Sequence, residues 1–203
     1  MPILHFITHP EVVIDPVTPV PEWPLSPEGI RRMGLALERP WMSRLGSVFS
    51  SAERKATDAA QLIGDCFHLS PVVVGELGEN DRSATGYLPK AEFEVVANLF
   101  FAQPERSVRG WERAVDAQRR INAAVDRVIA EAPRDRNIAV VSHGGVGSLL
   151  LCHLKGIPIN RAEDQPGAGG GASTPLIWKP ALYSLAGAGL RIKGPLFTHC
   201  GRS

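Results

Sequence analysis

The stretch of sequence that decides the fold reads Ile138-Ala139-Val140-Val141-Ser142-His143-Gly144-Gly145. Its first four residues are apolar and mostly β-branched, which is typical of a strand buried on both faces. The two glycines let backbone N–H groups approach a ligand closely, and a helix with regularly spaced apolar residues follows them. A strand that passes directly into a helix predicts an α/β domain with functional residues at the carboxyl end of the strand.

Other apolar runs repeat this arrangement along the chain. The expected strands cover residues 2–8, 48–49, 72–74, the last as a short buried strand, and 138–141, with closing strands and a turn at 187–189 between residues 174 and 193. The expected helices begin at Pro27, after a cap at Ser51, near residue 90, near Glu112 and after His143. We therefore predict one domain, residues 1–203, with three α/β/α layers around a mostly parallel sheet.

Three connections contain too much proline or glycine for regular structure. Residues 10–25 carry repeated prolines, residues 75–89 are rich in Gly, Asp and Asn, and residues 167–171 are almost all glycine. Long loops in compact domains are often functional, and the loop 10–25 and the helices near residues 90–110 are expected to close over the site.

The composition excludes several classes of function. The 203 residues include 22 Lys and Arg against 21 Asp and Glu, a net charge of +1, which predicts no nucleic-acid or membrane partner. The three cysteines form no C-x-x-C pair, which argues against a disulfide framework. No cation precedes Arg31 and no apolar run is long enough to span a bilayer, so a soluble, cytoplasmic protein is expected.

The histidines form no convincing metal-binding set, and no metal or other cofactor is expected. His5 and His153 stand in apolar surroundings and are interpreted as structural histidines, whereas His68 and His199 look peripheral. His9 and His143 differ from these because each follows a predicted strand.

The second predicted strand ends in Ser50-Ser51, and two cations, Arg54 and Lys55, follow at the start of a helix. Each cation opposes the helix dipole by about 0.3–1 kcal/mol, and a bound anion would reverse that cost. The helix that begins after His143 offers a second N-terminus suited to anions. Phosphate is the natural ligand for both.

Taken in order, these residues resemble the phosphoglycerate mutase-like histidine phosphatases. That family usually carries Arg-His-Gly, Ser-Ser-x-x-x-Arg-Ala, Leu-x-Glu and Ser-His-Gly-Gly. The corresponding segments here are Thr8-His9-Pro10, Ser50-Ser51-Ala52-Glu53-Arg54-Lys55-Ala56, Leu77-Gly78-Glu79 and Ser142-His143-Gly144-Gly145. Longer strings such as His9-Pro10-Glu11-Val12 resemble a little-characterised bacterial branch of the superfamily.

The resemblance implies that His9 attacks phosphorus, that His143 donates a hydrogen bond to the phosphoryl group, and that Glu79 protonates the leaving group. Lys55 and the helix start at Gly144 would bind phosphoryl oxygens. These roles suit phosphoryl transfer, which depends on positioning and charge neutralisation. Glu76 and Asp81 share the loop of Glu79 and remain alternatives for the proton donor.

Two departures from the family pattern weaken the expected phosphate site. Thr8 replaces the arginine before the nucleophile, and Lys55 replaces the second arginine with a point charge. Arg54 or Arg82 could restore a planar cation. Pro10 also lacks the N–H that a glycine would offer.

The first hypothesis is a metal-independent phosphohydrolase that forms a phosphohistidine and acts on a small phosphomonoester or a phosphorylated protein. The alternative is a catalytically weak or silent phospholigand-binding protein of the same fold. A phosphoglycerate mutase fits less well, because the Arg-His-Gly-Glu opening of that branch is missing. Oligomeric state is not readable from the residues.

Overall fold

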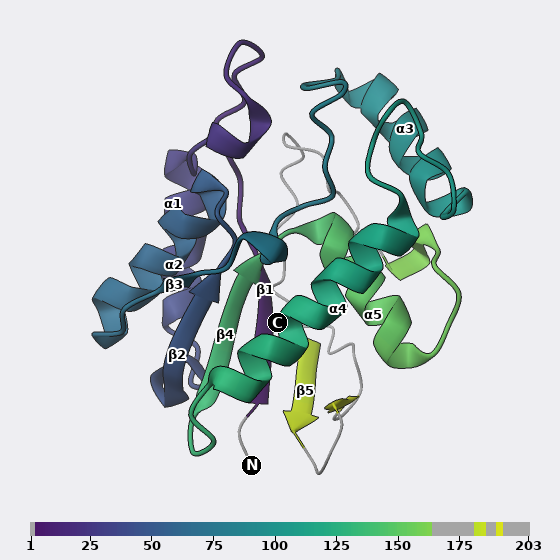
Figure 1. Ribbon diagram of the computed structural model, residues 1–203. Coiled ribbons are helices and arrows are strands. Elements are labelled where there is room, and N and C mark those ends of the chain that lie inside the picture. The colour runs from purple at the N-terminus through teal and green to yellow at the C-terminus, as the bar shows by residue number, and fades with distance from the viewer. Residues whose placement is uncertain (1–2, 164–180, 186–189, 193–203) are drawn as a thin grey trace, which may run out of the picture.

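The structure, a computed structural model, describes residues 3–163, 181–185 and 190–192. Its sheet has the strand order β3-β2-β4-β1-β5-β6 (Figure 1). Four strands run parallel, β1 (Ile3–Thr8), β2 (Leu45–Ser50), β3 (Val72–Val73) and β4 (Asn137–Ser142). Two antiparallel pairings add β5 (Ala181–Leu185) and β6 (Leu190–Ile192). The predicted mostly parallel sheet is confirmed.

Helices cover both faces of this sheet, which confirms the three-layer prediction (Figure 1). Helices α1 (Pro27–Leu37) and α2 (Arg54–Phe67) pack together on one face. Helices α4 (Ala114–Glu131) and α5 (Gly144–Lys155) pack together on the other, and α3 (Lys90–Ala102) lies beyond the end of the sheet. Short 3-10 helices occupy Val20–Glu22, Met42–Arg44, Gly75–Leu77 and Arg161–Glu163.

The period of two along β4 builds a hydrophobic core on each face. Ile138 and Val140 contribute to the core beneath α4 and α5, whereas Ala139 and Val141 contribute to the core beneath α1 and α2. All four side chains are fully buried. An uninterrupted apolar run is what a central strand with helices on both faces requires.

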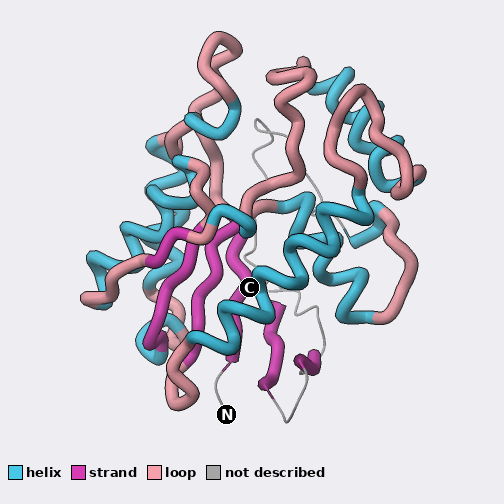
Figure 2. Tube along the Cα trace, in the orientation of Figure 1, coloured by secondary structure: helices cyan, strands magenta, loops and turns pink. Residues whose placement is uncertain are grey.

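Strands β1, β2 and β4 end side by side, and this edge of the sheet carries the loops (Figure 2). Thr8 pairs with Ser142, and Ser50 pairs with Val141. The His9 amide donates to the carbonyl oxygen of Ser142 at 3.0 Å. The residues that follow the three strands are therefore brought to one place.

Three local expectations are wrong. The valines of β3 are 48% and 55% exposed rather than buried, because β3 lies at the edge of the sheet. Helix α2 begins at Arg54 with Glu53, not Ser51, as its N-cap residue. His153 is exposed, since it lies on the outer side of α5. His199 and residues 167–171 and 187–189 lie outside the described residues.

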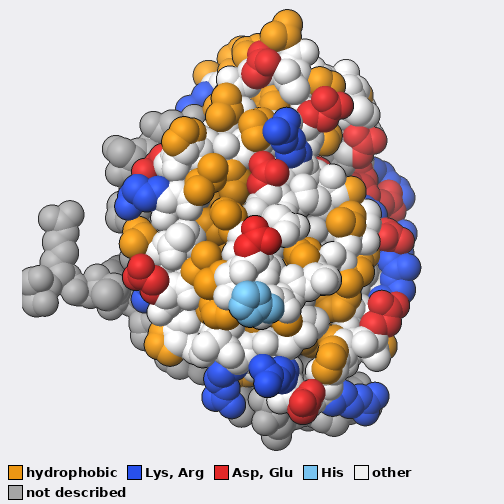
Figure 3. All heavy atoms as spheres, turned by 90° about the vertical axis from the view of Figure 1, so that its left-hand side faces the viewer, with side chains coloured by type: hydrophobic (Ala, Val, Ile, Leu, Met, Phe, Trp, Pro, Cys, Tyr) orange, Lys and Arg blue, Asp and Glu red, His pale blue; other side chains and the backbone are white. Residues whose placement is uncertain are grey.

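The surface over α1 and α2 mixes hydrophobic side chains with charges of both signs (Figure 3). Ile30 and Leu35 of α1 are among the exposed apolar residues there. On this face the charges do not gather into an extended basic surface, in keeping with the net charge of +1. Within the described part of the chain, no helix has the length and apolar character needed to cross a membrane.

Candidate active site

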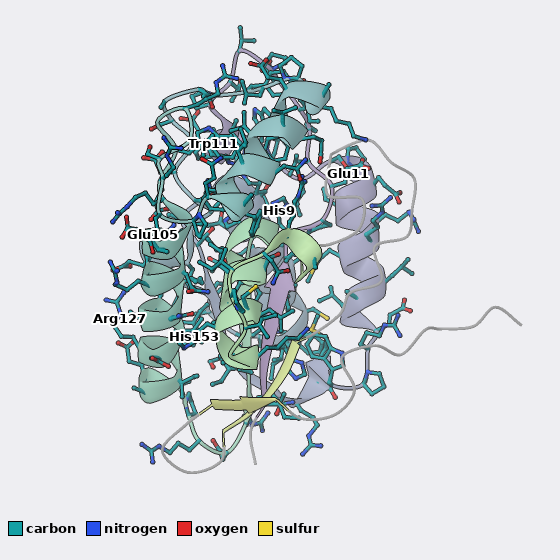
Figure 4. The ribbon with its side chains drawn as sticks, turned by 90° about the vertical axis from the view of Figure 1, so that its right-hand side faces the viewer. His9, Glu11, Glu105, Trp111, Arg127 and His153 are labelled. Atoms are coloured by element: carbon teal, nitrogen blue, oxygen red, sulfur yellow. The ribbon has the colours of Figure 1, made fainter. Side chains whose placement is uncertain are left out.

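His9 follows β1 at the edge where the strands end (Figure 4). Its Nδ1 atom lies 2.8 Å from the carbonyl oxygen of Pro10. A carbonyl oxygen can only accept, so Nδ1 carries the proton and Nε2 keeps its lone pair. Burial, and then the neighbouring His143, lower the pKa of His9 to about 3. The imidazole is therefore neutral near pH 7 and offers Nε2 as a nucleophile.

His143 is the N-cap residue of α5 and lies beside His9, with 5.2 Å between the ring centroids. Its Nε2 atom is 2.7 Å from Ser51 Oγ and 3.2 Å from Glu53 Oε1. Burial lowers the pKa of His143 to about 3, although the negative charge of Glu53 opposes that shift. In the unliganded site both histidines are neutral.

Lys55 and Glu53 form a buried ion pair at the start of α2. Lys55 Nζ lies 2.5 Å from Glu53 Oε2 and also donates to the carbonyl oxygen of Val20 at 2.8 Å. Burial alone would raise the pKa of Glu53, but His143 and Lys55 outweigh it and lower that pKa to about 2. Lys55 supplies the positive charge that is paired with Glu53 Oε2.

Glu79, in the loop of residues 75–89, caps the N-terminus of α5. Its Oε2 atom accepts from the Gly145 amide at 3.0 Å, and Oε1 accepts from the amides of Val146 at 3.0 Å and Asn80 at 3.1 Å. A Cβ on Gly145 would come within 2.6 Å of Glu79 Oε1, so glycine permits this close approach. The helix start predicted to bind phosphate thus holds a carboxylate of the chain itself.

Arg120 of α4 binds the backbone of the loop that carries Glu79. Its guanidinium donates to the carbonyl oxygens of Glu76, Gly78 and Glu79 and pairs with the Glu112 carboxylate at 2.7 Å. Arg120 and Glu112 also line a cleft of about 420 Å³ on this side of the loop. His9 and His143 do not line that cleft.

The three remaining residues predicted to bind phosphate have different surroundings. The Arg82 guanidinium lies over the rings of Phe93 and Trp111, 5.2 and 5.5 Å from their centroids, and its charge acts on His143. Arg54 is exposed, and within the described residues its guanidinium makes no hydrogen bond or ion pair. Thr8 ends β1 and is partly exposed. Of Arg54 and Arg82, Arg82 is therefore the better placed to act on a group bound beside His143.

The two predicted loops meet above the site. Trp23 of the proline-rich loop lies 5.7 Å from Tyr87 of the second loop, measured between ring centroids. At the base of the proline-rich loop, Glu11 accepts a hydrogen bond from the Ser26 hydroxyl at 2.8 Å, which ties the loop to the start of α1. In the described part of the chain, no three His, Cys, Asp or Glu side chains are grouped so that they could hold a metal ion.

Comparison of the sequence with protein families adds an independent observation. The model of the histidine phosphatase superfamily (branch 1) matches residues 17–176. The chain belongs to the histidine phosphatase superfamily. A comparison with curated proteins found no match.

Solved structures of other histidine phosphatases have the same fold. A mycobacterial glucosyl-3-phosphoglycerate phosphatase superposes with a TM-score of 0.74 at 20% identity, over 95% of this chain and 96% of the other. The YhfR protein of Bacillus stearothermophilus gives 0.69 at 18% identity, over 95% of both chains. A phosphoserine phosphatase variant from Entamoeba histolytica, in complex with phosphoserine, gives 0.68 at 14% identity, over 96% of both chains.

The sequence alone gives no role to Glu53 in this member of the histidine phosphatase superfamily. A carboxylate at a helix start ordinarily interacts with the helix dipole, so its presence alone does not indicate a functional residue. One signal could have revealed it: Glu53 directly precedes two cations that an anion was expected to neutralise. The structure shows that the chain supplies that anion.

Proposed function

We propose that the protein is a phosphohydrolase that transfers a phosphoryl group to His9 Nε2 and then to water. The observation that carries the proposal is the hydrogen bond from His9 Nδ1 to the Pro10 carbonyl oxygen, which leaves a neutral, oriented nitrogen beside His143. Substrates of this class are small phosphomonoesters or phosphorylated protein side chains. Membership of a phosphatase superfamily supports the proposal.

In the first step, His9 Nε2 bonds to phosphorus as the bond from phosphorus to the leaving oxygen breaks. Glu79 gives that oxygen a proton. In the second step, water attacks the phosphohistidine, Glu79 takes a proton from the water, and phosphate leaves with His9 restored. Lys55, His143 and Arg82 carry the charge of the phosphoryl oxygens, which is where catalysis of this reaction chiefly arises.

The surroundings of Glu79 fix the position of its carboxyl group and leave one acceptor position open. A carboxylate has about four acceptor positions, and the backbone amides of Asn80, Gly145 and Val146 occupy three of them. The fourth, on Oε2, remains for a proton. The hydrogen bonds also fix the carboxyl group, and a positioned acid or base contributes about 10²–10⁴-fold to rate.

A second candidate is a phospholigand-binding protein with little turnover. The observation that favours it is the charge of the site, where Thr8 has replaced a guanidinium and two carboxylates, Glu53 and Glu79, occupy the expected anion sites. Such a protein would bind phosphate without forming a covalent intermediate.

Trapping the intermediate separates the two candidates. The protein is mixed with a radiolabelled aryl phosphate or acetyl phosphate and quenched in alkali, under which phosphohistidine persists. We expect label on His9, no label in His9→Ala, and normal labelling of His153→Ala, which removes an exposed histidine at the far end of α5 (Figure 4). Binding of phosphate with no trapped label supports the second candidate, and label that persists in His9→Ala refutes the assignment of the nucleophile.

A further inference from the structure

Glu53 contacts three residues of the proposed site at once. Oε2 pairs with Lys55 Nζ at 2.5 Å, and Oε1 lies 3.2 Å from His143 Nε2 and accepts from the Glu79 amide at 2.8 Å. The Glu53 side chain is 14% exposed. A buried carboxylate with this many partners has a defined position and a persistent charge.

The charge of Glu53 determines which nitrogen of His143 carries a proton. His143 Nε2 has Ser51 Oγ as its hydrogen-bond partner at 2.7 Å, and an ionised Glu53 carboxylate 3.2 Å away favours a proton on the same nitrogen. A neutral imidazole then has its lone pair on Nδ1. Nδ1 is buried and has no hydrogen-bond partner among the described residues. It is the nitrogen left for a ligand.

A phosphoryl oxygen is an acceptor and cannot bind a nitrogen lone pair. Contact between Nδ1 and a phosphoryl group therefore requires a second proton on the ring, so that both nitrogens donate. The charged groups around His143 come from several elements: Glu53 and Lys55 from the start of α2, Glu79 and Arg82 from one loop, and Arg120 from α4. Burial disfavours the second proton most and Glu53 favours it, whereas the cations Lys55, Arg82 and Arg120 also disfavour it.

We propose that Glu53 is the positioning residue that turns His143 into an imidazolium when a phosphoryl group binds, so that binding takes up one proton. This inference rests on the proposed function, because it assigns His143 to the phosphoryl group. The imidazolium carries one proton on Nε2, beside Ser51 Oγ and the Glu53 carboxylate, and donates the other through Nδ1 to a phosphoryl oxygen. The proton comes from solvent and returns when phosphate departs. Glu53 itself contacts neither substrate nor the attacked phosphorus.

A purely structural role for Glu53 makes different predictions. As a counter-ion for Lys55 and an anchor for the Glu79 amide, it would affect stability and loop position but not the protonation of His143. Glu112 offers a matched control, because it is also a partly buried carboxylate that anchors the same loop, through Arg120, and it makes no contact with His143 in the described structure.

The test measures proton uptake on binding of inorganic sulfate, a phosphate analogue that stays a dianion from mildly acidic to alkaline pH. Isothermal titration calorimetry at pH 7 in buffers of different ionisation enthalpy gives the number of protons bound. We expect about one proton per sulfate for the unmodified protein and for Glu112→Gln. Glu53→Gln should take up less than half a proton and bind sulfate on the order of tenfold more weakly.

A spectroscopic measurement needs no variant. The ¹⁵N shifts of His143 in the sulfate complex should show both ring nitrogens protonated. Equal proton uptake in the unmodified protein and folded Glu53→Gln overturns the inference, as does a neutral His143 in the complex or the absence of sulfate binding. Phosphohistidine trapped on His9 alongside any of these results would show that the proposed function stands and that only the role of Glu53 is wrong.

Discussion

The N-termini of α2 and α5 both carry a carboxylate where an external anion was expected, yet the two carboxylates are used differently. At α5, Glu79 arrives from another loop and accepts hydrogen bonds from the amides of Gly145 and Val146. At α2, Glu53 is itself the N-cap residue, makes no capping bond, and directs its side chain to Lys55 and His143. Glu79 contacts backbone amides of α5, whereas Glu53 contacts the side chains of Lys55 and His143.

In the proposed function, this difference gives each carboxylate a different part in phosphoryl transfer. The Glu79 carboxyl group is held in position by backbone amides and keeps one acceptor position open on Oε2. A carboxylate paired with a buried ammonium stays charged and acts through its neighbours. In this proposal Glu79 exchanges protons with the leaving oxygen and with water, and Glu53 influences the charge of His143.

The largest expected effect comes from moving Glu79 off α5. Gly145→Ala places a methyl group 2.6 Å from the Glu79 Oε1 position, and the end of this flexible side chain must shift. We expect kcat on a generic phosphomonoester to fall by about 10²–10⁴-fold, the contribution of a positioned acid or base, while the protein stays folded. Steady-state kinetics and circular dichroism measure both.

The matched control is Gly34→Ala in α1, where a new Cβ meets nothing within 4 Å. Alanine should stabilise that helix by roughly 0.5–1 kcal/mol and leave kcat unchanged. A folded Gly145→Ala protein with normal kcat would show that the contact between Glu79 and α5 has no part in turnover.

The second prediction breaks the ion pair at α2. Lys55→Met removes the ammonium and leaves Glu53 buried without its cation, a change that costs about 3–5 kcal/mol in the free energy of unfolding. Adding Glu53→Gln to Lys55→Met should recover much of that loss, because no unpaired charge remains. Urea denaturation of the single and double variants tests this. Equal stability of Lys55→Met and the double variant would contradict the pairing.

The contrast between these helix starts also shows what the residues alone could predict. The rule that neighbouring parallel strands end at one edge brings His9 and His143 together only if their strands are neighbours, and the pairing of β1 with β4 supplies that condition. The partners of Glu53 depend on long-range packing, because Glu79 and His143 come from distant segments. The exposure of Val72 likewise depends on strand order, since a run of valines reads the same at the edge of a sheet as at its centre.

A buried histidine remote from both helix starts determines much of the response to acid. His5 is stacked on Trp41, and burial lowers its pKa from 6.5 to about 4. Between these pH values the unfolded chain binds a proton that the folded chain does not, so stability falls as pH drops from 6.5 to 4. His5 accounts for about 3 kcal/mol of this loss.

His5→Phe should therefore flatten the dependence of unfolding free energy on pH across this window by nearly one proton. His9, His143 and Glu53, whose pKa values are also lowered in the folded protein, contribute to the remaining slope. Urea denaturation at several pH values gives the slope, and exposed His153→Phe is the control. An unchanged slope in His5→Phe would mean that His5 is already protonated in the folded protein.

The smallest expected effect on turnover distinguishes Arg54, at the start of α2, from Arg82, in the loop that carries Glu79. Arg54 is the first residue of α2 but is exposed, whereas Arg82 is held over Phe93 and Trp111 with its charge acting on His143. Arg82→Ala should lower kcat/KM by about tenfold to a hundredfold, the equivalent of ~1.5–3 kcal/mol for a charged hydrogen bond. Arg54→Ala should change kcat/KM by less than about twofold, as expected for a solvated side chain.

Restoring the family arginine sharpens this result. If Arg82 supplies the cation that Thr8 lacks, Thr8→Arg should rescue most of the kcat/KM lost in Arg82→Ala, because one guanidinium can neutralise the same phosphoryl oxygens from the end of β1. Thr8→Arg in a folded Arg82→Ala background is measured with the same phosphomonoester. A rescue of Arg54→Ala but not of Arg82→Ala would reverse the assignment and make the start of α2, rather than the loop of Glu79, the source of the second cation.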